Sequence, residues 1–231
     1  MIHDQKVIVI IPAFNEELSI GSVIRDIPSI VDHIIVVDNN STDATAVTAA
    51  KNGAIVVSER KRGYGAACLA GIAAASLYEP DIIVFMDGDY SDYPEEIMKL
   101  LHPILHEDCE FVIGSRTLGI HQKGALLPQA RIGNFIACTL IRIFWGMRFT
   151  DLGPFRAIRY TSLLHLSMQD LTWGWTVEMQ IKAAKKKYAC TEVPVQYRKR
   201  IGTSKITGTL SGSIKAGYKI LSTIFYHAIA T

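Results

Sequence analysis

The tripeptide Asp87-Gly88-Asp89 places two carboxylates one residue apart, directly after an apolar run. Two such side chains can share a divalent cation, because Mg²⁺ and Mn²⁺ prefer oxygen ligands and usually share them with substrate phosphates. A bound metal would offset the negative charge that builds up on a leaving diphosphate. Asp-Gly-Asp is also ordinary turn chemistry, so its spacing alone does not choose between a metal site and a turn.

Two further polar clusters follow apolar runs. Asp38 ends one run, and a carboxylate there can accept a hydrogen bond from a base imino group or a ribose hydroxyl. In the residues after it, Ser41 or Asp43 would cap the next helix. Residues 12–17, Pro-Ala-Phe-Asn-Glu-Glu, form either a nucleoside-binding loop or a turn whose acids suit a helix N-terminus.

Basic residues form a third group of candidates. Arg62 ends a run of three bases, and Gly65 belongs to the glycine pair that follows it. Backbone N–H groups and a helix N-terminus can hold phosphate there, although the pattern is not that of a Walker loop. Arg116 and Arg131 are further candidates. Charge runs are usually solvated surfaces, but the Gly-flanked basic loop 198–205 can also close over a diphosphate.

The elements that would position these residues alternate along the chain. Apolar, β-branched runs predict strands, the periodic segments between them predict helices, and together they indicate an α/β fold with a mainly parallel sheet covered on both faces. Ligands of such sheets bind outside the carboxyl ends of the strands, so the polar clusters should converge on one crevice. Pro194 predicts an edge position or a strand start. The expected strands are 6–11, 33–37, 54–57, 81–86, 110–113, 155–160 and 191–197, and the expected helices are 18–27, 43–52, 65–78, 94–106, 126–145, 176–187 and 214–229.

Composition narrows the function classes. The 231 residues fit one domain, and 49% hydrophobic content supports a substantial core. The net charge is only +2, which gives no general attraction to nucleic acid. The four cysteines are far apart, so neither a zinc site nor a disulfide framework is indicated, and we expect reduced thiols in a cytoplasmic protein.

No secretory signal and no transmembrane helix are predicted. The nearest candidate for a membrane span is 132–147, but it contains Asn134 and Arg142, which fit a buried or interfacial helix better. The segment 198–212 is rich in Gly, Ser, Thr and Lys and is expected to be a mobile loop.

An ordered series of motifs resembles the inverting family 2 glycosyltransferases of the GT-A fold, over residues 7–212. The branch with the greatest similarity includes dolichol-phosphate mannosyltransferase and bacterial polyprenyl-phosphate sugar synthases. The order of the motifs is more specific than any one of them. They are Ile-Pro-Ala-Phe-Asn-Glu at 11–16, Val-Asp-Asn-Asn-Ser-Thr-Asp at 37–43, Arg-Gly-Tyr-Gly at 62–65, Asp-Gly-Asp at 87–89, Gly-Ser-Arg at 114–116 and Arg-Ile-Gly-Thr-Ser-Lys at 200–205.

The resemblance implies a nucleotide-diphosphate sugar as donor, with Mg²⁺ or Mn²⁺ as cofactor. Asp87 would contact the ribose or metal side with Gly88 beside it, and Asp89 would ligate the metal and the diphosphate. Relatives often have Gln or His where this chain has Ser91, which leaves the third metal ligand unsettled. The nucleoside would be held by Pro12, Ala13, Asn15, Glu16 and Asp38.

The resemblance also implies an acceptor region. Arg116 and Arg131 would meet an acceptor phosphate, and the flexible loop would carry Arg200 to the donor diphosphate. The chain would be one glycosyltransferase domain over 1–231, with a nucleotide-binding half (1–115), an acceptor-binding half (116–212) and a C-terminal amphipathic helix (213–230). The element of the family near Ser-Gly-Phe-Arg is altered here to Asp-Leu-Gly-Pro-Phe-Arg at 151–156.

The expected reaction is a single in-line displacement that inverts the anomeric carbon. A lipid phosphate such as polyprenyl or dolichyl phosphate is already anionic and needs little help from a base, whereas a hydroxyl acceptor needs a carboxylate, for which Asp151 and Glu178 are candidates. Trp173 and Trp175 would stack on sugar or pack in the core. A lipid acceptor predicts peripheral contact with the inner face of the membrane through 132–147 and the C-terminal helix, which would equally suit covering the sheet or a homodimer.

Two other classes stay open. A sugar-nucleotide nucleotidyltransferase also uses a doubly wound sheet and metal-bound carboxylates, but it usually has a Gly-rich phosphate loop where this chain has residues 12–16. A non-catalytic partner protein on a degenerate scaffold is the third class. The intact pair of aspartates argues against it, and Ser91 keeps it open.

Overall fold

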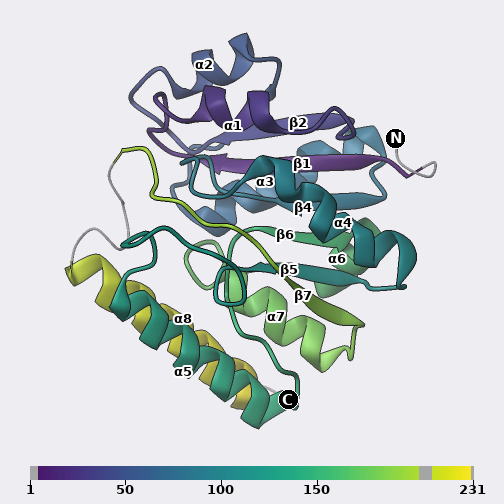
Figure 1. The fold of residues 1–231 in the computed structure, drawn as a ribbon, viewed down its shortest axis with the longest axis vertical. Helices are drawn as coiled ribbons and strands as arrows, with labels where there is room; N and C mark the ends of the chain where they lie inside the picture. Colours follow the sequence, from purple (N-terminus) through teal and green to yellow (C-terminus); the bar gives the residue numbers. More distant parts are fainter. Residues whose placement is uncertain (1–4, 203–209, 230–231) are drawn as a thin grey trace.

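A computed structural model describes residues 5–202 and 210–229 of the chain. A seven-stranded sheet in the order β3-β2-β1-β4-β6-β5-β7 forms its centre, with helices on both faces (Figure 1). The strands are β1 (Val7–Ala13), β2 (His33–Asp38), β3 (Ile55–Ser58), β4 (Ile82–Phe85), β5 (Phe111–Ser115), β6 (Arg156–Arg159) and β7 (Cys190–Pro194). The helices are α1 (Ile20–Asp26), α2 (Thr45–Lys51), α3 (Tyr64–Ala75), α4 (Ile97–His106), α5 (Pro128–Trp145), α6 (Tyr160–Leu166), α7 (Trp175–Lys185) and α8 (Leu210–Ile229), with 3₁₀ turns η1 (Ser76–Tyr78) and η2 (Pro94–Glu96).

Strand β1 explains why the core has two layers. Successive side chains of a strand point to opposite faces of the sheet. Ile8 and Ile10 therefore join one apolar cluster, with α3, α5, α7 and α8, while Val9 and Ile11 join the other, with α1, α2 and α4. All four side chains are fully buried, and each contributes roughly 1.5–3 kcal/mol to folding. The continuous apolar run in the sequence is thus required by burial on both faces.

The sheet is mainly parallel, as the sequence predicts, with β6 as the exception. Strands β1 to β4 pair in parallel, as do β5 and β7, whereas β6 is antiparallel to both β4 and β5. The chain enters β6 from a loop held beside Ser115, at the carboxyl end of β5, through a 2.7 Å hydrogen bond to Thr150. It can therefore only run back in the opposite direction.

The predicted elements agree with the structure except at a few boundaries and at one helix. The sequence prediction omitted α6, which begins directly after β6 without an intervening loop. Helix α8 begins at Leu210, earlier than predicted. Pro194 lies on β7 at the edge of the sheet, as expected. Most of the predicted loop at 198–212 falls on residues 203–209, outside the described residues.

Helices α5 and α8 lie side by side as a layer at the end of the molecule remote from β3 (Figure 1). Phe144 of α5 meets Phe225 of α8 edge to face, with ring centroids 6.0 Å apart. Within 5–202 and 210–229, no helix has both the length and the apolar character needed to cross a membrane. The outer side of the layer still exposes large apolar side chains: Ile132, Phe135, Ile136, Ile143, Phe144, Ile214, Tyr218, Phe225, Tyr226 and Ile229.

Candidate active site

A pocket of about 490 Å³ opens at the carboxyl ends of β1, β2 and β4, where the sequence predicts a crevice. Loops after these strands supply one part of its wall, and the segment before α7 and helix α8 supply another. The pocket is lined by Pro12, Ala13, Phe14, Glu16, Asn39, Arg62, Gly63, Tyr64, Ala67, Asp87, Gly88, Asp89, Thr172, Trp173, Arg200 and Lys219.

The predicted aspartate pair lies in this pocket. Asp89 is buried, its Oδ1 accepts a 2.9 Å hydrogen bond from the backbone N–H of Ser91, and its Oδ2 lies 2.6 Å from Nη2 of Arg200. A Cβ on Gly88 would make only ordinary van der Waals contacts, with Ile11 and Ile20 at 3.4 Å, so space does not require glycine between the two aspartates. Burial, followed by the nearby Asp89 charge, raises the pKa of Asp87 to about 7. Two acidic groups are therefore held close together beside one arginine.

Asp92 is a third carboxyl of this cluster that the sequence analysis did not single out. It is buried, and its Oδ2 lies 3.5 Å from the backbone nitrogen of Asp87. Its Oδ1 has no hydrogen-bond partner among the described residues. Burial, with the charges of Asp87 and Asp89, raises its pKa well above the ordinary value. The signal in the sequence is an acid five residues after Asp87.

The cluster suits a hard cation that is shared with a ligand. Carboxylate oxygens are what Mg²⁺ and Mn²⁺ prefer, and Mg²⁺ usually takes only one or two from protein. No group of three His, Cys, Asp or Glu side chains in 5–202 and 210–229 is arranged to hold a metal unaided. Asp87 and Asp89 line the pocket, whereas Ser91 is buried and does not belong to the described pocket lining. The two aspartates therefore fit a metal whose remaining ligands come from substrate and water.

Some residues of the loop after β1 line the pocket, and another residue holds the loop in place. Pro12, Ala13 and Glu16 line the pocket. Asn15, in a left-handed conformation (φ 53°), uses its side-chain oxygen to accept a 2.8 Å hydrogen bond from the backbone N–H of Thr42. It therefore fastens this loop to the loop after β2.

The loop after β2 also differs from the expectation. Oδ1 of Asp38 accepts a 3.2 Å hydrogen bond from Ser41 N–H, and Asp38 is not among the described residues that line the pocket. The adjacent Asn39 does line it, and its Oδ1 accepts a 2.8 Å hydrogen bond from the backbone N–H of Gly63. Asp43 accepts a 3.0 Å hydrogen bond from the first N–H of α2, that of Thr45, but the N-cap position itself is occupied by Ala44, so neither Ser41 nor Asp43 is the N-cap residue that the sequence predicts.

The basic segment before α3 brings one cation into the pocket. The Arg62 guanidinium lies over the ring of Phe14, 4.3 Å from its centroid. Gly63 has φ +151°, and a Cβ on it would lie 2.1 Å from the carbonyl oxygen of Leu171. A Cβ on Gly65 would lie 1.9 Å from the carbonyl oxygen of Asp170. Gly65 therefore permits close packing against the 170–173 loop and does not itself line the pocket.

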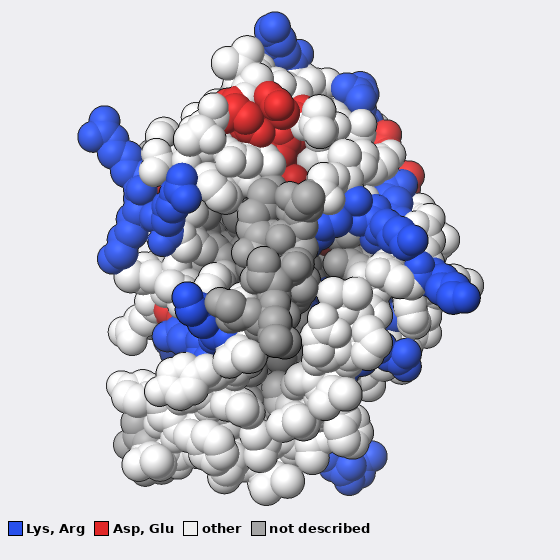
Figure 2. Space-filling view, turned by 90° about the vertical axis from the view of Figure 1, so that its left-hand side faces the viewer, with Lys and Arg blue, Asp and Glu red and all other residues white. Residues whose placement is uncertain are grey.

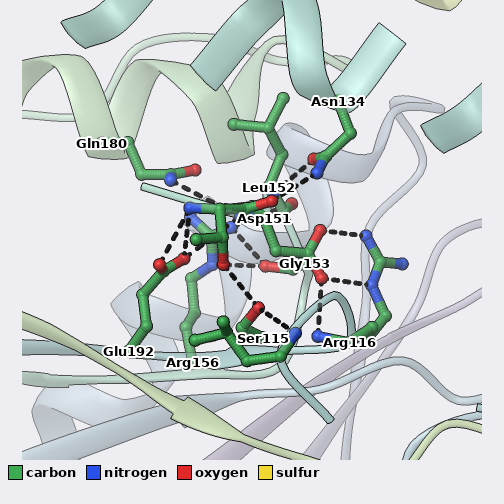
Figure 3. A network of polar contacts seen from close by, with 11 residues as sticks. Ser115, Arg116, Asn134, Asp151, Leu152, Gly153, Arg156, Gln180 and Glu192 are labelled. Atoms are coloured by element: carbon green, nitrogen blue, oxygen red, sulfur yellow. Dashed lines mark hydrogen bonds and ion pairs between the residues drawn. The ribbon is translucent and has the colours of Figure 1, made fainter. Parts of the chain in front are cut away.

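Arg116 lies behind the pocket in a buried polar network (Figure 3). Its backbone N–H and Nε donate to Oδ2 of Asp151, each at 2.8 Å, and its Nη2 donates to Oδ1 at 2.7 Å. The Asp151 side chain is 1% exposed. Burial is the largest single influence and lowers the pKa of Arg116, but the charge and hydrogen bonds of Asp151, together with the nearby Tyr197 and Asp92, raise that pKa well above its usual value. Asp151 is thus fully engaged, which argues against its predicted use as a base.

The backbone around Asp151 is held from three other elements. Asn134 of α5 donates to the Thr150 carbonyl and accepts from Leu152 N–H, both at 2.7 Å. Glu192 of β7 accepts from the N–H groups of Thr150 and Asp151, and Gln180 of α7 donates to the Asp151 carbonyl at 3.0 Å. Figure 3 shows these side chains converging on the loop. The position of Arg116 is therefore fixed by α5, α7 and β7 together.

The remaining predicted residues lie apart from the pocket. Arg131 is exposed on α5 and does not belong to the described pocket lining. Glu178 is buried, pairs with Lys182 at 2.7 Å and accepts hydrogen bonds from the backbone before α7, so it is structural. The two tryptophans separate: Trp173 lines the pocket, whereas Trp175 is buried against Phe85. Of the predicted basic loop, residues 203–205 lie outside the described structure.

Two lining residues had no signal in the sequence. Thr172 precedes Trp173 in an irregular segment, and Lys219 belongs to α8, far along the chain from the aspartates. Only the packing of α8 against the 170–174 segment brings Lys219 to the pocket.

Comparisons with known proteins agree with this architecture. The family model described as glycosyl transferase family 2 matches residues 8–162. An uncharacterised glycosyltransferase of Mycobacterium tuberculosis is 36% identical over 213 residues, which cover 91% of this chain and 94% of that protein. A dolichyl-phosphate hexose transferase of Haloferax volcanii is 32% identical, covering 89% and 88% respectively.

A solved structure supports the fold alone. Glucosyl-3-phosphoglycerate synthase from Mycobacterium tuberculosis, in complex with Mn²⁺, UDP and glucosyl-3-phosphoglycerate, has a TM-score of 0.76 at 24% identity, covering 97% of this chain and 80% of that one. The architecture is thus that of the GT-A fold. Together with the match of the family model over more than half of the sequence, it leads to one assignment: the chain is an enzyme that belongs to glycosyltransferase family 2.

Proposed function

We propose that this enzyme transfers a hexose from a nucleoside-diphosphate sugar, with Mg²⁺ or Mn²⁺, to a polyprenyl or dolichyl phosphate. The observation that carries the donor half is the single pocket in which Asp87 and Asp89 lie with Arg62 and Arg200. Paired carboxylates and cations around one cavity match a diphosphate with its metal. The solved fold neighbour was crystallised with UDP and Mn²⁺, which supports the same ligand class here.

The chain's own residues divide the donor between them. Pro12, Ala13 and Glu16 would contact the nucleoside, together with Asn39, which lines the same pocket. Arg200, whose Nη2 lies 2.6 Å from Oδ2 of Asp89, would hold the donor diphosphate beside that carboxylate. A bound cation would supply charge stabilisation for the leaving nucleoside diphosphate.

The acceptor half rests on relatives and on the surface formed by α5 and α8. The H. volcanii relative is named for transfer to dolichyl phosphate. Residues 111–150 and 193–231 contain no Asp or Glu, but they contain eleven Lys and Arg residues. Figure 2 shows the end of the molecule formed by α5 and α8 as a largely uncharged surface with Lys and Arg at its margins. Apolar side chains flanked by basic residues suit an anionic lipid surface.

A second candidate is a soluble acceptor. The specific observation in its favour is the fold neighbour, which was crystallised with glucosyl-3-phosphoglycerate. Family membership argues against the sugar-nucleotide nucleotidyltransferase alternative, because the matched family transfers sugars.

A substrate screen tests the proposal. Wild-type enzyme is incubated with Mn²⁺ and UDP- or GDP-hexoses, together with polyprenyl phosphate or phosphoglyceric acid, and nucleotide release is measured. We expect release that depends on polyprenyl phosphate for at least one donor. Release only with the soluble acceptor would replace the proposal by the second candidate.

Membrane contact has its own test. Replacing Phe135 and Phe225 by glutamate places two charges on the apolar surface of α5 and α8, and should abolish sedimentation with anionic vesicles. Leu77→Glu, at an exposed leucine on η1, serves as the matched control and should leave sedimentation unchanged. Equal sedimentation of the double variant and the control would contradict contact through this surface.

A further inference from the structure

Among the described residues, three cationic side chains line the donor pocket, and one of them has no assigned task. Arg200 pairs with Asp89, and Arg62, whose guanidinium lies over the ring of Phe14, is assigned with Arg200 to the donor diphosphate. The third is Lys219, which comes from α8 and therefore from outside the residues 8–162 that the family model matches. A lysine ammonium is a compact point charge that commonly binds phosphate.

Lys219 is held at the pocket by a short ion pair. Its Nζ lies 2.7 Å from Oδ2 of Asp170, whose side chain is only 6% exposed, while the Lys219 side chain is 40% exposed. Asp170 Oδ1 accepts a 2.7 Å hydrogen bond from Thr172 N–H, so the carboxylate is fixed from both sides. The ammonium has three protons to donate, and the ion pair with Asp170 accounts for one direction only.

Close packing of α8 keeps Lys219 at this place. A Cβ on Gly174 would lie 2.3 Å from Asp170 Oδ2 and 2.7 Å from Thr223 Oγ1 of α8. Only glycine therefore allows α8 to approach the start of α7 so closely. The same segment carries Trp173 into the pocket. Lys219, Thr172 and Trp173 consequently form one wall whose geometry depends on α8.

Another side of α8 belongs to the exposed apolar surface that α8 forms with α5. Tyr218, directly before Lys219, is 76% exposed and stands about 100° away around the helix. Lys219 is thus located at the border between that surface and the pocket. A phosphate whose hydrocarbon chain lies against α5 and α8 would meet Lys219 as it enters the pocket.

We propose that Lys219 binds the phosphate monoester group of the acceptor, an inference that rests on the proposed transferase function. In the proposed function, Arg62 and Arg200 would hold the donor diphosphate, and a metal held by Asp87 and Asp89 would offset the rest of its charge. The acceptor phosphate needs a separate cation, because two anionic groups must approach each other for the displacement. Lys219 supplies that charge from an element that also faces the lipid surface.

The test compares Lys219→Ala with Lys219→Arg, and uses Lys215→Ala as matched control on an exposed lysine one turn earlier in the same helix. Acceptors are detergent-solubilised polyprenyl phosphate and, as a soluble phosphate monoester, phosphoglyceric acid. Loss of a charge-assisted hydrogen bond should raise the acceptor KM about tenfold or more in Lys219→Ala. The donor KM should stay within twofold of wild type, Lys219→Arg should recover part of the loss, and Lys215→Ala should match wild type.

Asp170→Asn distinguishes phosphate binding by Lys219 from a purely structural role of the ion pair between Lys219 and Asp170. Asparagine keeps an oxygen for Thr172 N–H but removes the charge that competes for Lys219. Phosphate binding by Lys219 predicts an unchanged or lower acceptor KM in this variant. If the donor KM and the acceptor KM rise in parallel in both Asp170→Asn and Lys219→Ala, the ion pair has only a structural role and the inference is overturned. An unchanged acceptor KM in Lys219→Ala would also overturn it.

Wild-type results separate this inference from the proposed function. If the wild type uses only phosphoglyceric acid, the lipid acceptor is wrong and Lys219 is judged on the soluble phosphate. If the wild type transfers sugar to neither acceptor, both proposals fail.

Discussion

Replacing Asp151 by alanine removes the acceptor of three hydrogen bonds from Arg116, at 2.7 and 2.8 Å. The Arg116 side chain is 15% exposed, so water replaces the lost carboxylate poorly. Removing one partner of a buried ion pair costs about 3–5 kcal/mol of folding free energy. For a chain of this size, each kcal/mol shifts the melting temperature by about 2–4 °C, so a decrease of about 6–20 °C is expected.

A double-mutant cycle with differential scanning calorimetry measures this effect. Arg116→Met alone should also be destabilising, because it leaves the Asp151 carboxylate buried without its partner. Combining Arg116→Met with Asp151→Leu should recover most of the stability, since apolar replacements of a buried pair are often neutral. A melting temperature of Asp151→Ala equal to that of wild type would refute the account of the network.

Asp151→Asn distinguishes positioning from base catalysis. Asparagine keeps the size of the side chain but cannot accept from both edges of the guanidinium, so stability and turnover should fall together. A loss of turnover of more than about 100-fold with an unchanged melting temperature would restore Asp151 as a general base.

Two further predictions concern close packing and the thiols. Gly65→Ala would put a Cβ 1.9 Å from the Asp170 carbonyl oxygen and should lower both the melting temperature and the nucleotide affinity. Gly133→Ala is the control on exposed α5, where a Cβ would meet no atom within 4 Å, and it should stabilise the fold by about 0.5–1 kcal/mol. Equal effects of the two substitutions on the melting temperature would contradict the packing argument. Burial raises the pKa of the Cys138 and Cys190 thiols to about 12, with a smaller contribution from the charge of Asp151 at Cys138 and of Glu110 at Cys190. The reactive thiolate is therefore scarce at pH 8 and forms only as the pH approaches 12. Iodoacetamide should therefore label the folded protein slowly at pH 8 and all four cysteines after unfolding in guanidinium. Rapid labelling of the folded protein at pH 8 would contradict the burial of Cys68, Cys109 and Cys138 and the raised pKa of the half-buried Cys190.

Local pattern was sufficient to predict most of the sheet. Residues 7–11 of β1 are β-branched throughout and buried on both faces of the sheet, so this strand could be predicted from the sequence alone. The direction of β6 was not predictable in this way, because it depends on where the loop at Thr150 is fastened. The short helix α6 likewise follows β6 without the turn residues that usually mark a boundary.

The same distinction applies to the candidate site. Asp87 and Asp89 could be found because the end of a buried strand is a local feature. Trp173 and Trp175 are separated by one residue, yet Trp173 lines the pocket and Trp175 packs in the core, since Trp173 precedes α7 and Trp175 is its first residue. Lys219 reaches the pocket only through the packing of α8 on Gly174, a contact between distant segments that no motif encodes.

The central claim is that this pocket binds a nucleoside diphosphate through Asp89 and a divalent metal. Isothermal titration calorimetry of UDP and GDP, with and without Mn²⁺, measures this in wild type and in Asp89→Ala. The account predicts binding of at least one nucleotide that requires Mn²⁺ and is lost in Asp89→Ala, while both proteins keep the same fold by circular dichroism. Metal-dependent binding that persists unchanged in Asp89→Ala, or failure of wild type to bind either nucleotide with Mn²⁺, would contradict it.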